Sequence, residues 1–186
     1  MARLPYVDPE SAPKRVRTAL ERVPPLNVFR MMANAETAFR PWLAFGGALL
    51  SSLELDARLR ELAILRVARL SGAEYEWVQH APIALAEGSS REQVDAVDRY
   101  ELDHESLADV DRAVLRFTTS VVEDVRASDE TFAVVREHLS PREVVELLLV
   151  IGQYMTVARV ARTADIELDG PPERLVSDSA AARPGV

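Results

Sequence analysis

The sequence predicts an all-α, single-domain protein, and three observations support this. The 186 residues include only seven glycines, and Ala, Leu, Val, Glu and Arg dominate the chain. Strict alternation of polar and apolar residues is hard to find, whereas helical spacing of apolar residues is frequent. A chain of 186 residues can bury one core without disulfides or a structural metal. We expect one helical domain over residues 1–170 and a flexible tail over 171–186.

Cap, proline and glycine signals divide the first half of the chain. Asp8-Pro9 begins a helix that should end near Arg22, before Val23-Pro24-Pro25. Residues 26–33 are expected to form a connector with apolar anchors. Three further helices are expected, over residues 35–51, from the cap Asp56 to the pair Ser71-Gly72, and over 73–87.

The second half carries similar signals. Ser90 and Gln93 have the spacing of a capping box and begin a short helix. An amphipathic segment follows over residues 107–126, and Asp129 begins another short helix. Ser140-Pro141-Arg142-Glu143 combines a cap, a first-position proline and a capping-box glutamate, so the last helix should run over residues 141–164.

Composition excludes several classes of function. The chain has no cysteine, which rules out thiol nucleophiles, disulfides, thiolate zinc sites and iron–sulfur clusters. Its formal charge is −8, whereas a nucleic-acid-binding protein is expected to have a basic surface. The N-terminus has no apolar signal region, and we expect no membrane span and a cytoplasmic location.

The densest group of polar and aromatic residues lies over residues 72–80, at the start of the predicted fourth helix. Glu76 and His80 are four residues apart and therefore share a helix face, and Tyr75 and Gln79 form a second such pair. A carboxylate beside an imidazole gives a general acid–base pair near neutral pH. The alternative is a surface pair that only supports the helix, although the two nearby aromatic residues favour burial.

This region resembles the carboxymuconolactone decarboxylase and AhpD-like (alkylhydroperoxidase D-like) superfamily. In the peroxidase branch a glutamate precedes Cys-x-x-Cys-x-x-x-His, and overlaying that pattern puts the two cysteines on Ala73 and Glu76, the histidine on His80 and the glutamate on Glu61. The segments Asp56 to Arg66 and Leu148 to Tyr154, and the connector at Asn27-Val28-Phe29-Arg30, also look like this family. The resemblance covers about residues 25–168 and implies an AhpD-like helical bundle.

The resemblance also implies which chemistry is lost. Peroxide reduction in this superfamily uses one thiolate as nucleophile and a second thiol to resolve it, and neither thiol is present here. The acid–base residues Glu61, Glu76 and His80 remain. We therefore expect non-redox chemistry, such as decarboxylation, lactone opening or isomerisation, on a small carboxylate-bearing molecule; the alternative is a catalytically inactive binding or assembly protein.

If the protein is an enzyme of this kind, Glu76 and His80 transfer protons and Glu61 orients His80. Five other residues are candidate substrate-binding groups: Tyr75, Gln79, Arg66, Tyr154 and Arg159. One of the two arginines would hold the substrate carboxylate, although pairing with an acid or a neighbouring subunit is the simpler role for Arg159. With three histidines in the chain we expect no metal and no cofactor. The resemblance and the apolar last helix imply a homo-oligomer, as a dimer, trimer or hexamer.

Overall fold

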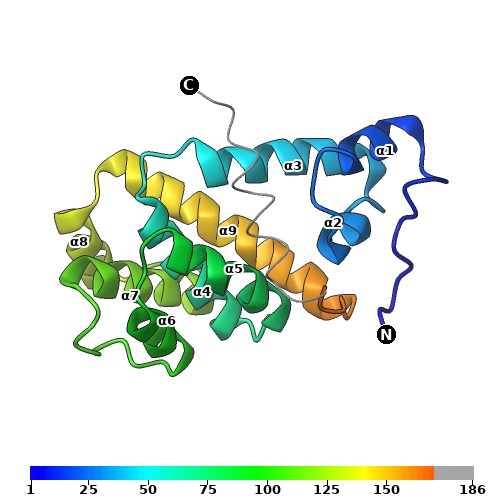
Figure 1. The fold of residues 1–186 in the computed structure, drawn as a ribbon. Helices are drawn as coiled ribbons and strands as arrows, with labels where there is room; N and C mark the ends of the chain where they lie inside the picture. Colours follow the sequence, from blue (N-terminus) through cyan, green and yellow to red (C-terminus); the bar gives the residue numbers. More distant parts are fainter. Residues whose placement is uncertain (170–186) are drawn as a thin grey trace.

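The computed structural model describes residues 1–169, and these form nine helices and no strand (Figure 1). The helices are α1 (Lys14–Leu20), α2 (Asn27–Met32), α3 (Glu36–Ser51), α4 (Ala57–Leu70), α5 (Glu74–Ala86), α6 (Arg91–Asp98), α7 (Asp109–Asp124), α8 (Asp129–His138) and α9 (Pro141–Thr163). The predicted all-α class is confirmed. The predicted tail over residues 171–186 lies outside the described residues.

Helix α4 is the centre of the bundle. Its apolar residues occur on every side of the helix, and each residue from Leu59 to Ala68 is buried. The helix packs against α5, α7 and α9, and α6 covers a further side. The Asp56 side chain accepts a hydrogen bond from the Leu59 N–H at its start, as the sequence predicted. Gly72, with φ of +59°, lets the chain turn from α4 into α5.

Two apolar clusters fix the helices around α4. One joins α4 to α7 and α9 through side chains such as Ile64, Phe117 and Ile151. The other joins α4 to α5, α6 and α7 through side chains such as Leu62, Ala84 and Val97. The second cluster holds α5 against α4, and α5 also contacts α9.

The N-terminal region differs from the sequence expectation. The first helix begins at Lys14, because residues 8–12 form turns in which the Asp8 side chain accepts from the Glu10 N–H. Pro13 has extended ψ, and a proline also disfavours the helical conformation of the residue before it. The expected connector over residues 26–33 is a short helix, α2. The remaining helices begin and end within about two residues of their predicted limits.

Helix α9 crosses the fold diagonally and touches α2, α3, α4, α5, α7 and α8 (Figure 1). By length and composition alone, α9 contains an 18-residue window apolar enough to cross a bilayer. However, 56% of that window is buried against the other helices. This burial is typical of the core helix of a globular domain.

Candidate functional site

The candidate site forms where α4, α5 and α9 meet. Glu61 lies in the middle of α4 and is fully buried, with 0% exposure. One of its carboxylate oxygens, Oε2, lies 2.8 Å from His80 Nδ1 on α5. The other, Oε1, accepts from Arg60 Nε at 2.9 Å. Because Glu61 already accepts from Arg60, it is the acceptor toward His80 as well, and the hydrogen of a neutral imidazole lies on Nδ1.

The imidazole of His80 is therefore held in one orientation. His80 is 9% exposed, and its ring lies edge-on to that of Tyr154 on α9, with the centroids 4.8 Å apart. Among residues 1–169 no hydrogen bond reaches Nε2 of His80. This nitrogen keeps its lone pair when the ring is neutral, so it is the atom that could take a proton from a bound molecule.

Glu76 lies one turn before His80 on α5 and is 1% exposed. Neither of its carboxyl oxygens has a hydrogen-bond partner among the described residues. Burial in this apolar position raises the pKa of Glu76 to about 9, so its carboxyl group carries a proton at neutral pH. A buried protonated carboxyl group can donate a proton to an anion that forms beside it.

Tyr154 connects these groups. Burial raises the pKa of Tyr154 well above 10, and the nearby carboxyl groups of Glu61 and Glu76 raise it further. Both carboxyl groups thus lie near enough to act on this phenol, and His80 contacts its ring. The structure thus brings Glu61, Glu76, His80 and Tyr154 together.

The other predicted substrate-binding residues lie elsewhere. The hydroxyl of Tyr75 donates to Asp169 and accepts from the Val28 N–H, and Gln79 Nε2 lies 3.5 Å from Asp169. This second helical pair thus fastens the segment after α9 to α5. Within residues 1–169, neither Tyr75 nor Gln79 forms a side-chain hydrogen bond with His80 or Glu76.

The two predicted arginines also point away from the imidazole. Arg66 Nε donates to Thr119 on α7 at 2.9 Å, and its guanidinium lies over the Tyr100 ring. Desolvation lowers the pKa of Arg66. Arg159 is exposed on α9, where NH1 donates to the Met155 carbonyl of its own helix.

One polar neighbour was missed from the sequence. Arg60 precedes Glu61, is 6% exposed, and also donates from NH1 to the Leu50 carbonyl at 3.0 Å. Its position beside Glu61 was visible in the sequence, but its burial was not. Arg60 fixes the carboxylate that orients His80, so it supports the site without touching the imidazole.

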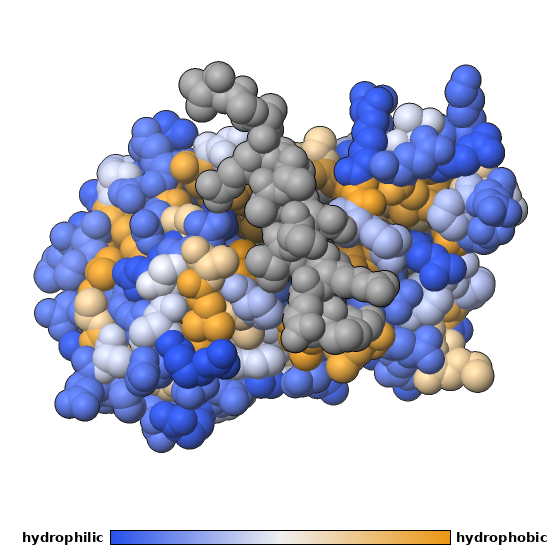
Figure 2. Space-filling view, viewed as in Figure 1, coloured by the Kyte–Doolittle hydropathy of each residue, from blue (hydrophilic) through white to orange (hydrophobic). Residues whose placement is uncertain are grey.

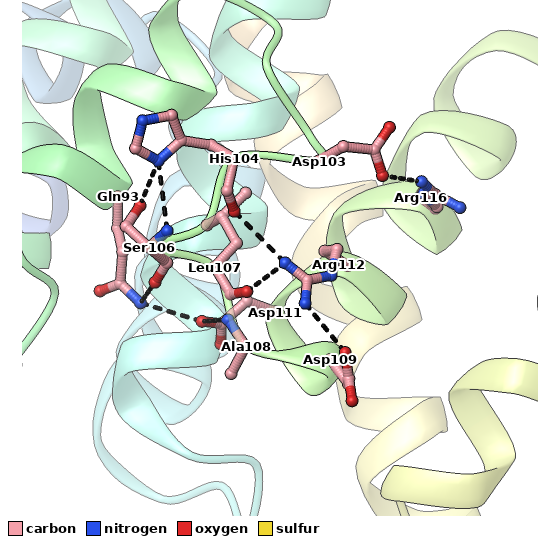
Figure 3. Close-up of polar contacts among 10 residues, drawn as sticks. All are labelled: Gln93, Asp103, His104, Ser106, Leu107, Ala108, Asp109, Asp111, Arg112 and Arg116. Carbon is pink, nitrogen blue, oxygen red and sulfur yellow. Dashed lines mark hydrogen bonds and ion pairs between the residues drawn. The ribbon is translucent and has the colours of Figure 1, made fainter.

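The remaining histidines take no part in this cluster. His104 is partly buried, and its Nδ1 lies 2.9 Å from the Ser106 hydroxyl (Figure 3). His138 is the last residue of α8, as predicted for a cation at a helix C-terminus. No group of three potential metal ligands occurs within residues 1–169.

The fold and the cluster together define a class of protein. It is a helical bundle without thiols that buries the carboxyl group of Glu76, the carboxylate of Glu61 and the imidazole of His80. Residues 36–101, which contain Glu61, Glu76 and His80, match the model of the Carboxymuconolactone decarboxylase family. This match confirms the resemblance to that family over residues 36–101. No curated protein sequence matches the chain significantly.

Solved structures show the same fold. A peroxidase-related protein of Ralstonia eutropha with an alkylhydroperoxidase AhpD core has a TM-score of 0.80 at 20% identity, covering 91% of this chain and 93% of its own. A peroxidase-related protein of Silicibacter sp. has a TM-score of 0.75 at 17% identity, covering 91% and 92%. A variant of the debrominase Bmp8 in complex with 2,3,4-tribromopyrrole has a TM-score of 0.73 at 16% identity, covering 93% and 95%. The AhpD-like architecture predicted from the sequence is thus confirmed.

Proposed function

We propose that the protein catalyses non-redox acid–base chemistry on a small carboxylate-bearing molecule, by decarboxylation, lactone opening or isomerisation. The observation that carries the proposal is Glu76, a buried carboxyl group whose pKa is raised to about 9, one helical turn from an imidazole held by Glu61. A protonated acid and an oriented base side by side are the two groups such reactions need.

The three side chains have separate roles in this proposal. In isomerisation of an unsaturated acid, His80 Nε2 takes a proton from the carbon between the double bond and the carbonyl group, and Glu76 donates its proton to the far carbon of the resulting dienolate. A proton then passes from the imidazolium to the Glu76 carboxylate, which restores both groups. In decarboxylation, carbon dioxide leaves, the electrons of the broken bond stay on the remaining carbon, and Glu76 protonates that carbon and is reprotonated from solvent. Glu61 keeps the hydrogen of His80 on Nδ1 and fixes the orientation of the ring.

The chain itself excludes the thiol chemistry of the peroxidase branch. Ala73 and Glu76 occupy the positions where that branch has cysteines, and no cysteine occurs elsewhere in the 186 residues. Peroxide reduction through a sulfenic acid and a resolving thiol therefore has no nucleophile here. The descriptions of the structural neighbours as peroxidase-related proteins or a debrominase apply to those proteins.

Tyr154 is the candidate substrate-binding residue best supported by contacts, since its ring touches His80. The substrate-binding roles of Tyr75, Gln79, Arg66 and Arg159 stay predictions, as do the small-molecule substrate and the cytoplasmic location. Arg159 forms no ion pair among the described residues, which leaves its guanidinium able to hold a substrate carboxylate, whereas Arg66 already interacts with the Glu123 carboxylate.

Deuterium exchange gives a direct test that needs no knowledge of the product. The protein is incubated in D₂O with a panel of small keto acids, lactones and unsaturated carboxylic acids, and carbon-bound deuterium and loss of carbon dioxide are followed by NMR. We expect at least one compound to exchange or react with the wild-type protein. His80→Gln and Glu76→Gln should each slow that reaction by about 100-fold or more, the usual contribution of general acid–base catalysis.

His138→Gln, at the end of α8, is the matched control and should react at the wild-type rate. No reaction with any compound, or equal rates for all variants, would favour the inactive alternative.

A second candidate function, as an assembly protein, is favoured by exposed apolar residues. Phe45 and Leu50 on α3 are 39% and 41% exposed, and Val145, Leu148 and Leu149 on α9 are 54%, 39% and 44% exposed. Figure 2 shows hydrophobic residues, in orange, among hydrophilic ones on this face of the molecule. Because α3 and α9 pack on each other, we propose that their outer faces join copies of this chain into a homo-oligomer.

A further inference from the structure

A groove of about 350 Å³ lies among the end of α9, the turn from α4 into α5, and α7. Its apolar part is formed by Val122, Met155 and Ala158. The hydroxyl-bearing residues Ser71 and Thr163 also line it, and the two cationic residues are Arg159 and Arg162. The volume is within the range of small-molecule sites.

The charge of this groove is opposite to that of the protein. The chain has a formal charge of −8, yet the lining contains two arginines and no acidic residue. Neither arginine forms an ion pair within residues 1–169. Asp165, the acid nearest in sequence to the end of α9, is already paired with Arg3 at 2.7 Å.

Arg162 is held in place by the backbone. Its NH1 donates to the carbonyls of Ser71 and Gly72, at 3.1 and 2.8 Å, where the C-terminal end of α4 favours a cation. A side chain at Gly72 would clash with this guanidinium, so the glycine makes room for it. Nε and NH2 of Arg162 remain free of partners among the described residues, and Arg159 uses only NH1.

A larger cavity elsewhere serves as a contrast. It measures about 620 Å³ between α7 and α8, and Arg112 and Arg116 line it together with four carboxylates. These two arginines are already engaged, Arg112 with Asp109 and the carbonyls of His104 and Leu107, and Arg116 with Asp103 (Figure 3). Cations without carboxylate partners thus distinguish the smaller groove.

We propose that the groove at Arg159 and Arg162 binds a small organic oxyanion, a carboxylate or phosphate monoester carried on a short apolar or aromatic group. Guanidinium groups bind such oxyanions by paired, charge-assisted hydrogen bonds. Val122, Met155 and Ala158 would contact the apolar part, and the Ser71 and Thr163 hydroxyls are additional donors. The proposal rests on the groove itself, although Arg159 is also a candidate to hold the carboxylate of the proposed acid–base substrate.

The test uses benzoate and phenyl phosphate as probes and uncharged benzamide as the control compound. Binding is measured by titration of the full-length ¹⁵N-labelled protein, which reports both the dissociation constant and the amides that shift. We expect saturable binding of at least one anion, with shifts at Ser71, Gly72 and Thr163, and no binding of benzamide. The relative affinity of the two anions distinguishes a carboxylate from a phosphate ligand.

Arg159→Ala is the decisive variant, because the side chain contacts only its own helix and its loss should not disturb folding. It should raise the dissociation constant at least about tenfold. Arg17→Ala, at an exposed position on α1, should leave the constant within about twofold. Absence of saturable binding, shifts confined to other regions, or an unchanged constant in Arg159→Ala would overturn the proposal, and none of these results bears on His80.

Discussion

Replacing Glu76 by glutamine should remove a specific pH dependence of stability. Burial raises the pKa of Glu76 from 4.5 to about 9 in the folded protein. Between these two values the native protein keeps a proton that the unfolded chain has released. The free energy of unfolding of the wild-type protein therefore falls as pH rises through this window, by about 1.4 kcal/mol per pH unit from this one group.

Glutamine at this position has nearly the same shape and no proton to lose. The stability of Glu76→Gln relative to wild type should therefore increase by about 3 kcal/mol between pH 5.5 and 7.5. Below pH 4.5 the wild-type carboxyl is protonated in both states, so the contribution of Glu76 to the difference vanishes. Contributions from all other titrating groups cancel in the comparison.

Urea denaturation followed by circular dichroism at several pH values measures this difference. With a slope of about 2 kcal/mol per molar urea, the midpoints of the two proteins should separate by about 1.5 M more at pH 7.5 than at pH 5.5. Glu36→Gln, at an exposed position in the first turn of α3, should show no such trend. Parallel pH profiles for wild type and Glu76→Gln would refute the assignment of a buried protonated carboxyl group.

Three further predictions concern the support of the site and the surface. Glu61→Gln leaves the buried Arg60 without its carboxylate and should lower the free energy of unfolding by about 3 kcal/mol in the same urea experiment. Its control is Glu74→Gln, which breaks a partly exposed ion pair with Arg69 and should lower the free energy of unfolding by less than about 1 kcal/mol. Gly72→Ala should destabilise the protein by about 1–2 kcal/mol in thermal unfolding, because Gly72 has a positive φ and lies against the Arg162 guanidinium. Gly47→Ala, at a helical position with open space around it, should stabilise the protein by about 0.5–1 kcal/mol. Leu149→Lys on the exposed face of α9 should shift sedimentation toward smaller species, and Leu4→Lys should not.

Two results would count against these predictions. Equal costs for Glu61→Gln and Glu74→Gln would show that the buried ion pair around His80 is unimportant. A monomeric wild-type protein at micromolar concentration would remove the basis of the proposed assembly, while leaving the acid–base centre untested by that measurement.

Local sequence signals predicted most of the fold because the helix ends are encoded locally. The Asp56 and Ser90 caps and the turn at Gly72 depend on a few neighbouring residues, and the structure has them as expected. The start of α1 was misplaced because Asp8-Pro9 has the pattern of a helix start, whereas the helix begins only after Pro13, which is its N-cap residue. The helix α2 is only six residues long, too short for a periodic pattern.

The candidate site was predictable only in part. The spacing of Glu76 and His80 on one helix, with the family resemblance, pointed to Glu61 as the partner of His80. The same spacing put Tyr75 and Gln79 in one pair, but that pair meets Asp169, whose approach depends on how the chain returns after α9. The contact of Tyr154 with His80 and the burial of Arg60 likewise follow from the packing of α9 and α4, which no local pattern specifies.

The protonation state of Glu76 is the central claim, and its carboxyl ¹³C signal tests it most directly. Protein labelled with ¹³C at the glutamate side-chain carboxyl is titrated by NMR, and the signal missing from Glu76→Gln identifies Glu76. We predict that this signal belongs to a protonated carboxyl group at pH 7 and titrates with a midpoint near 9. A midpoint near 4.5, the ordinary value for glutamate, would mean that Glu76 is ionised at neutral pH and cannot act as the acid of the proposed reaction.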